Sequence, residues 1–146
     1  MGAATKFLNY RARSEKEVHD KLIADYPEEI TQKIISALKS YKYIDDEDFA
    51  RRFATDSANL NNNGLLKIKF GLLEKGVSEE VIENVLSGLD LAEQENIIKL
   101  IEKKTSGSHS LDAKGKRKLF NYLANKGFQY SQISSCFAEY FYDDEF

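Results

Sequence analysis

The residues of this chain that could do chemistry are mainly basic, and they gather in short segments. Four basic side chains fall within five positions, at Lys114, Lys116, Arg117 and Lys118. They occupy the start of a predicted helix, where positive charge opposes the helix dipole. Because lysine and arginine pair with anionic groups, we expect this segment to bind phosphate or an acidic protein surface. The alternative is an ordinary solvated helix face.

Two pairs of arginines are the other basic candidates. Arg11 and Arg13 precede the first strong helix-capping signal, and Arg51 and Arg52 lie on a helix that also carries two phenylalanines four residues apart. Side chains with that spacing occupy one face of a helix. The arginines on this helix are therefore expected to point away from the apolar face.

Groups typical of catalytic and metal sites are scarce. The two histidines, His19 and His109, have no metal-ligand spacing, and we place His19 at the rim of a helix and His109 in a polar loop. The single cysteine, Cys136, excludes an internal disulfide, and it lies on an apolar stripe. A buried small hydrophobe is favoured there over a nucleophile. Phosphate-binding glycine motifs are absent, so we predict no catalytic site, no metal and no cofactor.

Four consecutive carboxylates, at 45–48, could be taken for a metal site. An EF-hand loop requires a central glycine and a glutamate at its twelfth position, whereas Phe49 and Ala50 follow here. Asp45 is well placed to cap a helix, with three further acids against the positive end of its dipole. Helix capping is therefore the favoured interpretation.

The elements that must position these residues are helices. Ser14 and Glu17 form a capping box, and glycines stand at the predicted helix ends. One proline in 146 residues and no tryptophan argue against a turn-rich β-fold. Further helix signals are Pro27 in a first turn, an apolar stripe at Ile30, Ile34, Ile35 and Leu38, a turn at 61–64 and a second capping box at 90–93.

These helical segments repeat with a period near 50 residues. Leu72 and Gly76 recur as Leu123 and Gly127, a shift of 51. Three helices fit into each unit, and each unit is too small to bury its own apolar face well. We therefore predict an all-α fold of nine helices in three tandem three-helix repeats, over 1–45, 46–90 and 91–146, in an elongated array. The first helix is expected at 4–11.

Charge is unevenly distributed along the sequence. The whole chain carries a net charge of −3, but residues 99–126 carry +6 and the remainder −9. Overall acidity argues against a protein that mainly grips bare DNA. No apolar run reaches the roughly 18 residues of a membrane-spanning helix, and no hydrophobic signal stretch follows Met1, so we expect a cytoplasmic protein.

Two tyrosines, Tyr41 and Tyr43, bracket Lys42 near the predicted boundary between the first two repeats. Packing between the repeats is the favoured use of these rings. Stacking on a base or on a partner side chain is the alternative.

Several motifs, taken in order, resemble the RecX family, whose members regulate the RecA recombinase. The opening signature is matched by YRARSEKEVHDKL at 10–22, and the most recognisable motif by YIDDEDFA at 43–50. The turn signatures of the second and third repeats are matched by LEKGVS at 73–78 and YLANKGF at 122–128. The resemblance covers about residues 7 to 142, and the combination in order is specific.

The resemblance implies a curved, elongated monomer that binds in the groove of the RecA–DNA filament. There it would suppress ATP hydrolysis and strand exchange, and so modulate recombination, DNA repair and the SOS response; some members also bind DNA directly. It makes Arg13, Arg51 and Arg52 candidate contacts, whereas Lys114 to Lys118 rest on charge alone. The alternative is a helical-repeat nucleic-acid-binding protein that acts without a recombinase.

Overall fold

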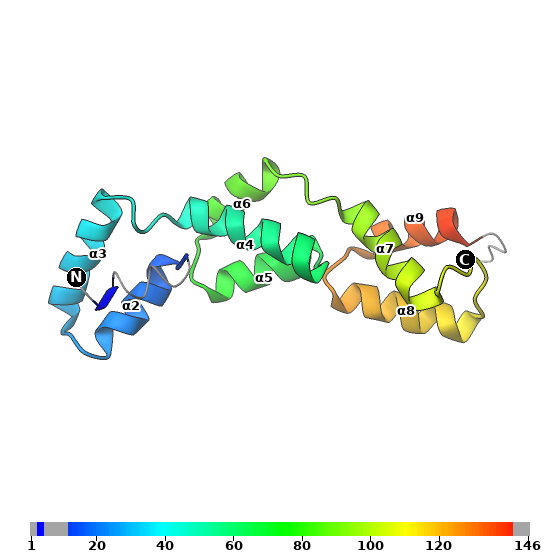
Figure 1. Ribbon diagram of the computed structural model, residues 1–146, viewed down its shortest axis with the longest axis horizontal. Coiled ribbons are helices and arrows are strands. Elements are labelled where there is room, and N and C mark those ends of the chain that lie inside the picture. Colours follow the sequence, from blue (N-terminus) through cyan, green and yellow to red (C-terminus); the bar gives the residue numbers. More distant parts are fainter. Residues whose placement is uncertain (1–2, 5–11, 142–146) are drawn as a thin grey trace. The chain divides into compact units, whose positions relative to one another are not determined.

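The computed structural model describes residues 3–4 and 12–141, and these residues form helices and no strand (Figure 1). The all-α prediction is confirmed. The helix expected at 4–11 lies, apart from Ala4, outside the described residues. The helices are α2 (Glu15–Ile23), α3 (Glu28–Ser40), α4 (Asp46–Asn61), α5 (Leu65–Glu74), α6 (Glu79–Ser87), α7 (Glu93–Thr105), α8 (Ala113–Asn125) and α9 (Tyr130–Tyr140).

The side-chain caps predicted at Ser14 and Asp45 are confirmed. Ser14 Oγ accepts the amide of Glu17 at 3.2 Å, and the Glu17 carboxylate accepts the amide of Ser14 at 3.1 Å. Asp45 Oδ1 accepts the amides at positions 47 and 48, at 3.1 and 3.2 Å. The acidic run at 45–48 therefore begins a helix, as predicted.

The capping box predicted at 90–93 is wrong. Ala92 holds the N-cap position of α7 with φ 51° and no side-chain cap, and Asp90 Oδ1 accepts the Ala92 amide at 2.9 Å. Glu93 Oε2 instead accepts the amide of Leu65, the first residue of α5, at 2.9 Å. Gly64 precedes α5 and has no side chain to cap it, so an acid from a distant helix supplies the missing acceptor.

The apolar stripe predicted on α3 is partly wrong. Ile30 is 45% exposed, whereas the buried residues of α3 are Thr31, Ile35 and Leu38. Pro27 stands at the N-cap, one position before the predicted first turn. The buried face is therefore rotated from the predicted one, and it follows the spacing i, i+4, i+7.

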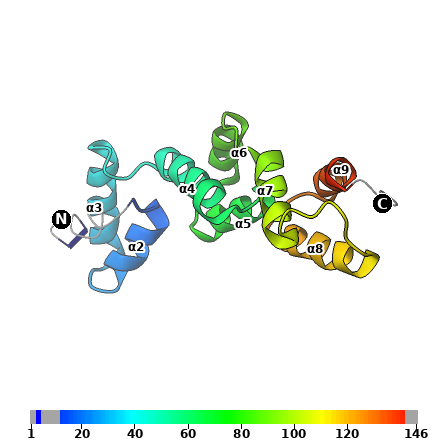
Figure 2. The ribbon, with the colours of Figure 1, turned by 45° about the vertical axis from the view of Figure 1, so that its right-hand side comes forward.

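The chain divides into two compact units. The first comprises residues 1–53 and 71–89, the second 54–70 and 90–146. In the first, α2 packs against α3 around a core that includes Val18, Leu22 and Leu38. In the second, α7, α8 and α9 pack together around a core that includes Ile97, Leu123 and Phe137 (Figure 2).

In the first unit, the N-terminal end of α2 meets the C-terminal turn of α5, and we call this contact the first junction. Ser14 Oγ donates a hydrogen bond to the carbonyl of Lys75 at 2.7 Å. Gly76 has φ +80°, and a Cβ added there would lie 2.5 Å from the Cβ of Lys16. Both the backbone conformation and the close approach therefore require glycine.

In the second unit, the N-terminal end of α5 meets the C-terminal turn of α8 in the same way, and we call this contact the second junction. The amide of Gly64 donates to the carbonyl of Lys126 at 2.7 Å, and the amide of Leu66 donates to that of Gly127 at 3.0 Å. The free amides of one helix thus satisfy the free carbonyls of another, with the two dipoles head to tail.

A carboxylate from the start of a later helix stabilises the first amide at each junction. Asp46 Oδ1 accepts the amide of Glu15 at 2.9 Å, as Glu93 Oε2 accepts that of Leu65. Asp46 is the first residue of α4, and Glu93 is the first residue of α7. Burial raises the pKa of Asp46 above its ordinary value, because desolvation disfavours the charged carboxylate.

Candidate functional site

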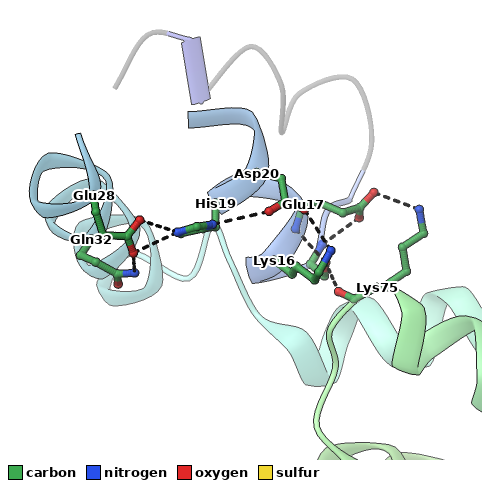
Figure 3. A network of polar contacts seen from close by, with 8 residues as sticks. Lys16, Glu17, His19, Asp20, Glu28, Gln32 and Lys75 are labelled. Carbon is green, nitrogen blue, oxygen red and sulfur yellow. Dashed lines mark hydrogen bonds and ion pairs between the residues drawn. The ribbon is translucent and has the colours of Figure 1, made fainter. Parts of the chain in front are cut away.

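Of the two arginines predicted near the N-terminus, the structure describes Arg13, which contributes to the first junction rather than to an open surface. Arg11 lies outside the described residues. The Arg13 side chain is 12% exposed, and its Nη1 lies 3.7 Å from Glu17 Oε2. The same carboxylate oxygen accepts from Lys75 Nζ at 3.2 Å (Figure 3). Arg13 therefore belongs to a local ion-pair network that involves both α2 and the end of α5.

The arginines on α4 are exposed, as predicted. Phe49 is buried and its ring centre lies 5.9 Å from that of Phe53, so the apolar face of the helix faces inward. Arg51 and Arg52 both face solvent. Arg52 Nε also forms a 2.9 Å ion pair with Asp48, one turn earlier on the same helix. An exposed pair of this kind is weak, so both guanidinium groups remain accessible to an anionic partner.

The basic start of α8 divides into an exposed face and one buried residue. Lys114, Arg117 and Lys118 are exposed and share one side of the helix by their i, i+3, i+4 spacing. Lys116 is 6% exposed, with its Nζ 5.1 Å from the centre of the Phe141 ring. The accessible positive face of α8 thus consists of three side chains, while the Lys116 stem is packed in the core.

The histidines and the cysteine hold structural positions. His19 Nε2 lies 2.8 Å from Glu28 Oε2, which together with Asp20 raises the pKa of the imidazole (Figure 3). His109 Nδ1 lies 3.0 Å from the carbonyl oxygen of Tyr140. Cys136 is buried as predicted, and burial raises the pKa of its thiol, which makes it a poor nucleophile.

Two further features of the described residues concern metal binding and the crossing of a membrane. Within residues 3–4 and 12–141, no group of three or more His, Cys, Asp or Glu side chains is arranged to hold a metal ion. None of the helices in this part of the chain combines the length and apolar character needed to cross a membrane.

The tyrosine pair predicted to pack between repeats is exposed, so that prediction is wrong. Tyr41 is 71% exposed and Tyr43 60%, with their ring centres 6.5 Å apart. Lys42 between them has φ 60°, and the next residue, Ile44, is buried. Ile44 thus provides the apolar anchor for this loop, and the two rings are left on its surface.

One group of cations is not among the predicted site residues, although two of its three members belong to the positive segment 99–126. Lys67 and Lys126 lie at the second junction, where Lys67 packs against Gly127, and Lys103 is near enough for its charge to lower the pKa of Lys126; we call these three the junction lysines. Burial and the charges of the other two lower the pKa of Lys126. The available signal was the repeat itself, because Lys16 and Lys75 of the first junction recur as Lys67 and Lys126 at a shift of 51.

Comparison with known proteins accounts for this arrangement of helices. Models of three consecutive domains of one family match the chain in order. The first three-helix domain of RecX matches residues 1–38, the second residues 45–86 and the third residues 92–137.

Whole relatives agree with these domain matches. A regulatory protein RecX of Clostridium botulinum is 38% identical over 142 residues, which cover 94% of this chain and 66% of the relative. One from Clostridium acetobutylicum is 30% identical, with 94% and 67% covered. The chain thus spans about two thirds of the length of these curated relatives.

A solved structure shares the fold. The crystal structure of RecX from Lactobacillus salivarius superposes with a TM-score of 0.83 at 30% identity, covering 94% of this chain and 92% of the other. A sequence match in every three-helix domain and a shared fold along nearly the whole length lead to one conclusion. This chain belongs to the RecX family.

Proposed function

We propose that this chain regulates the RecA recombinase by binding the RecA–DNA filament and inhibiting its ATP hydrolysis and strand exchange. The observation that carries the proposal is the match to all three RecX domains, in family order, along most of the chain. The curated relatives are named regulatory proteins. In such a role the chain would modulate recombination, DNA repair and the SOS response as a cytoplasmic monomer.

The binding surfaces in this proposal are the exposed cations. Arg51 and Arg52 on α4 and the α8 face of Lys114, Arg117 and Lys118 are the candidate contacts to acidic protein surface or DNA phosphate. Lys116 is left out because its stem is packed in the core. Three repeats, bounded at 45 and 90, would contact neighbouring recombinase protomers and block the inter-subunit motions that hydrolysis requires.

The test is the ATPase activity of RecA on single-stranded DNA with this protein added. Inhibition is expected, and no inhibition at several-fold excess would contradict the proposal. The double variant R117E/K118E is expected to inhibit less. A matched control is K21E/K33E, which reverses two exposed lysines on α2 and α3. Equal loss of inhibition in both would show an effect of net charge rather than of the α8 face.

A second candidate function is direct action on nucleic acid without a recombinase. It predicts salt-sensitive binding to bare DNA and no effect on RecA ATPase. Here too R117E/K118E is the informative pair, because a carboxylate at position 116 would be forced into the core beside Phe141.

A further inference from the structure

The two junctions are built alike but differ in charge. At the first junction each lysine has a carboxylate partner. Lys16 Nζ lies 3.0 Å from Asp20 Oδ2, and Lys75 Nζ lies 3.2 Å from Glu17 Oε2 (Figure 3). The first junction is therefore locally neutralised.

The second junction keeps the lysines but loses the two acids that pair with them at the first junction, while Glu93 still accepts the amide of Leu65 there. At a shift of 51, Lys16 corresponds to Lys67, and Lys75 corresponds to Lys126. The positions of the two partners change type, since Glu17 becomes Ile68 and Asp20 becomes Gly71. Two cations are thus retained at equivalent places, while both of their counter-charges are removed.

A third cation adds to this excess. Lys103, near the end of α7, is close enough to Lys126 for its charge to lower the pKa of that ammonium group, as Lys67 also does. Among the residues that the structure describes, no carboxylate lies within ion-pair distance of any junction lysine. The three junction lysines therefore have no ion-pair partner among the described carboxylates, an arrangement that an anion would stabilise.

The cluster is also held in place by the backbone. Lys126 Nζ donates to the carbonyl of Asn61 at 2.6 Å, and the Lys126 carbonyl accepts the amide of Gly64 at 2.7 Å. Lys67 is fixed from the other side, because its backbone and Cβ lie directly against Gly127. A partly buried lysine held between two helices is pre-organised, so little further ordering is needed to bind a ligand there.

We propose that the junction lysines bind the phosphate backbone of single-stranded DNA. The three cations come from three separate helices or helix ends. A DNA strand presents several phosphates in a row and can contact all three, whereas a single carboxylate cannot. The inference rests on the proposed function, since that function brings the protein to a filament formed on such a strand. It adds a direct DNA contact at a place that none of the predicted basic residues occupies.

The test uses the full chain and a fluorescein-labelled oligo(dT) strand, with binding followed by anisotropy between 50 and 300 mM salt. The variant K67Q/K126Q removes two junction charges, and K16Q/K75Q removes their equivalents at the neutralised first junction. We expect K67Q/K126Q to bind about tenfold more weakly at low salt, with the slope of log K against log salt shallower by about 1.4. The control is expected to retain the affinity and slope of the unmodified chain.

Three results would overturn the assignment. They are absence of strand binding by the unmodified chain at 50 mM salt, unchanged binding by K67Q/K126Q, and equal weakening in both double variants. Thermal unfolding by circular dichroism checks that both double variants are folded at the temperature of the binding measurement.

The RecA ATPase assay separates this inference from the proposed function. Inhibition by the unmodified chain, with strand binding unaffected in K67Q/K126Q, would refute the junction site and leave the regulatory function standing. Absence of inhibition, with strand binding that depends on Lys67 and Lys126, would refute the regulatory function and leave the junction site standing. If K67Q/K126Q lost inhibition while still binding the strand normally, the cluster would contact acidic protein and not phosphate.

Discussion

Gly127 lies directly against Lys67: a Cβ atom at position 127 would stand 2.5 Å from the backbone nitrogen of Lys67 and 2.5 Å from its Cβ. Gly76 has the same relationship to the Lys16 side chain. Each of these glycines ends one helix where another begins, and each has a positive φ. Glycine is thus required at both junctions for two independent physical reasons, conformation and space.

Gly127→Ala is expected to lower the free energy of unfolding by about 3 kcal/mol, because alanine adds left-handed strain to a clash with fixed backbone. Gly107→Ala is the matched control. Gly107 has φ +83°, but nothing lies within 4 Å of an added Cβ, so about 1 kcal/mol is expected. Urea unfolding followed by circular dichroism measures both, and equal losses would contradict a close-packed second junction.

Glu93→Ala is expected to destabilise the chain by about 1–2 kcal/mol, because the partly buried amide of Leu65 loses its acceptor. Glu95→Ala removes an exposed acid from the same first turn of α7 and serves as the control. It should change stability by less than about 0.5 kcal/mol. A Glu93→Ala chain as stable as the control would show that this long-range cap contributes nothing.

The pKa of His19 is raised, mainly by its hydrogen bond to Glu28 and further by Asp20. Since the folded value lies above the unfolded value of 6.5, the protonated imidazole favours folding. That stabilisation is complete below pH 6.5 and is lost as the pH rises through the folded pKa. We expect an NMR titration midpoint for His19 above 6.5, lowered by Glu28→Gln and unmoved by Glu29→Gln. A midpoint at or below 6.5 in the unmodified chain would refute the pairing.

Lys116→Ala is expected to cost about 1–2 kcal/mol of stability, since it removes a buried stem and the contact of its ammonium group with the Phe141 ring. Lys114→Ala, two residues earlier on the same helix and exposed, should cost less than about 0.5 kcal/mol. Thermal or urea unfolding distinguishes them. Should both variants unfold like the unmodified chain, Lys116 would belong with the exposed face of α8 after all.

The features that could be predicted are those that depend on residues close together in the sequence. Ser14 with Glu17, Asp45 before its acidic run, and the glycines that end α5 and α8 act within one helical turn, so the sequence carries the whole signal. Periodicity served less well on α3, where Ile30 is exposed and Thr31 is buried. Two helix faces that are rotated from each other by one residue can be almost equally apolar. Hydrophobicity alone cannot decide which of them is buried unless the elements packed against the helix are known.

The sequence by itself determined the helical class, most helix ends, the 51-residue recurrence and the motifs that resemble RecX. Only the tertiary structure decided which partner each charged group finds. Glu93 caps a helix that begins 28 positions earlier, and Ser14 bonds a carbonyl 61 positions later. It also showed that Lys75 is neutralised while its equivalent Lys126 is not. Such pairings depend on how helices pack, and no local spacing in the chain records them.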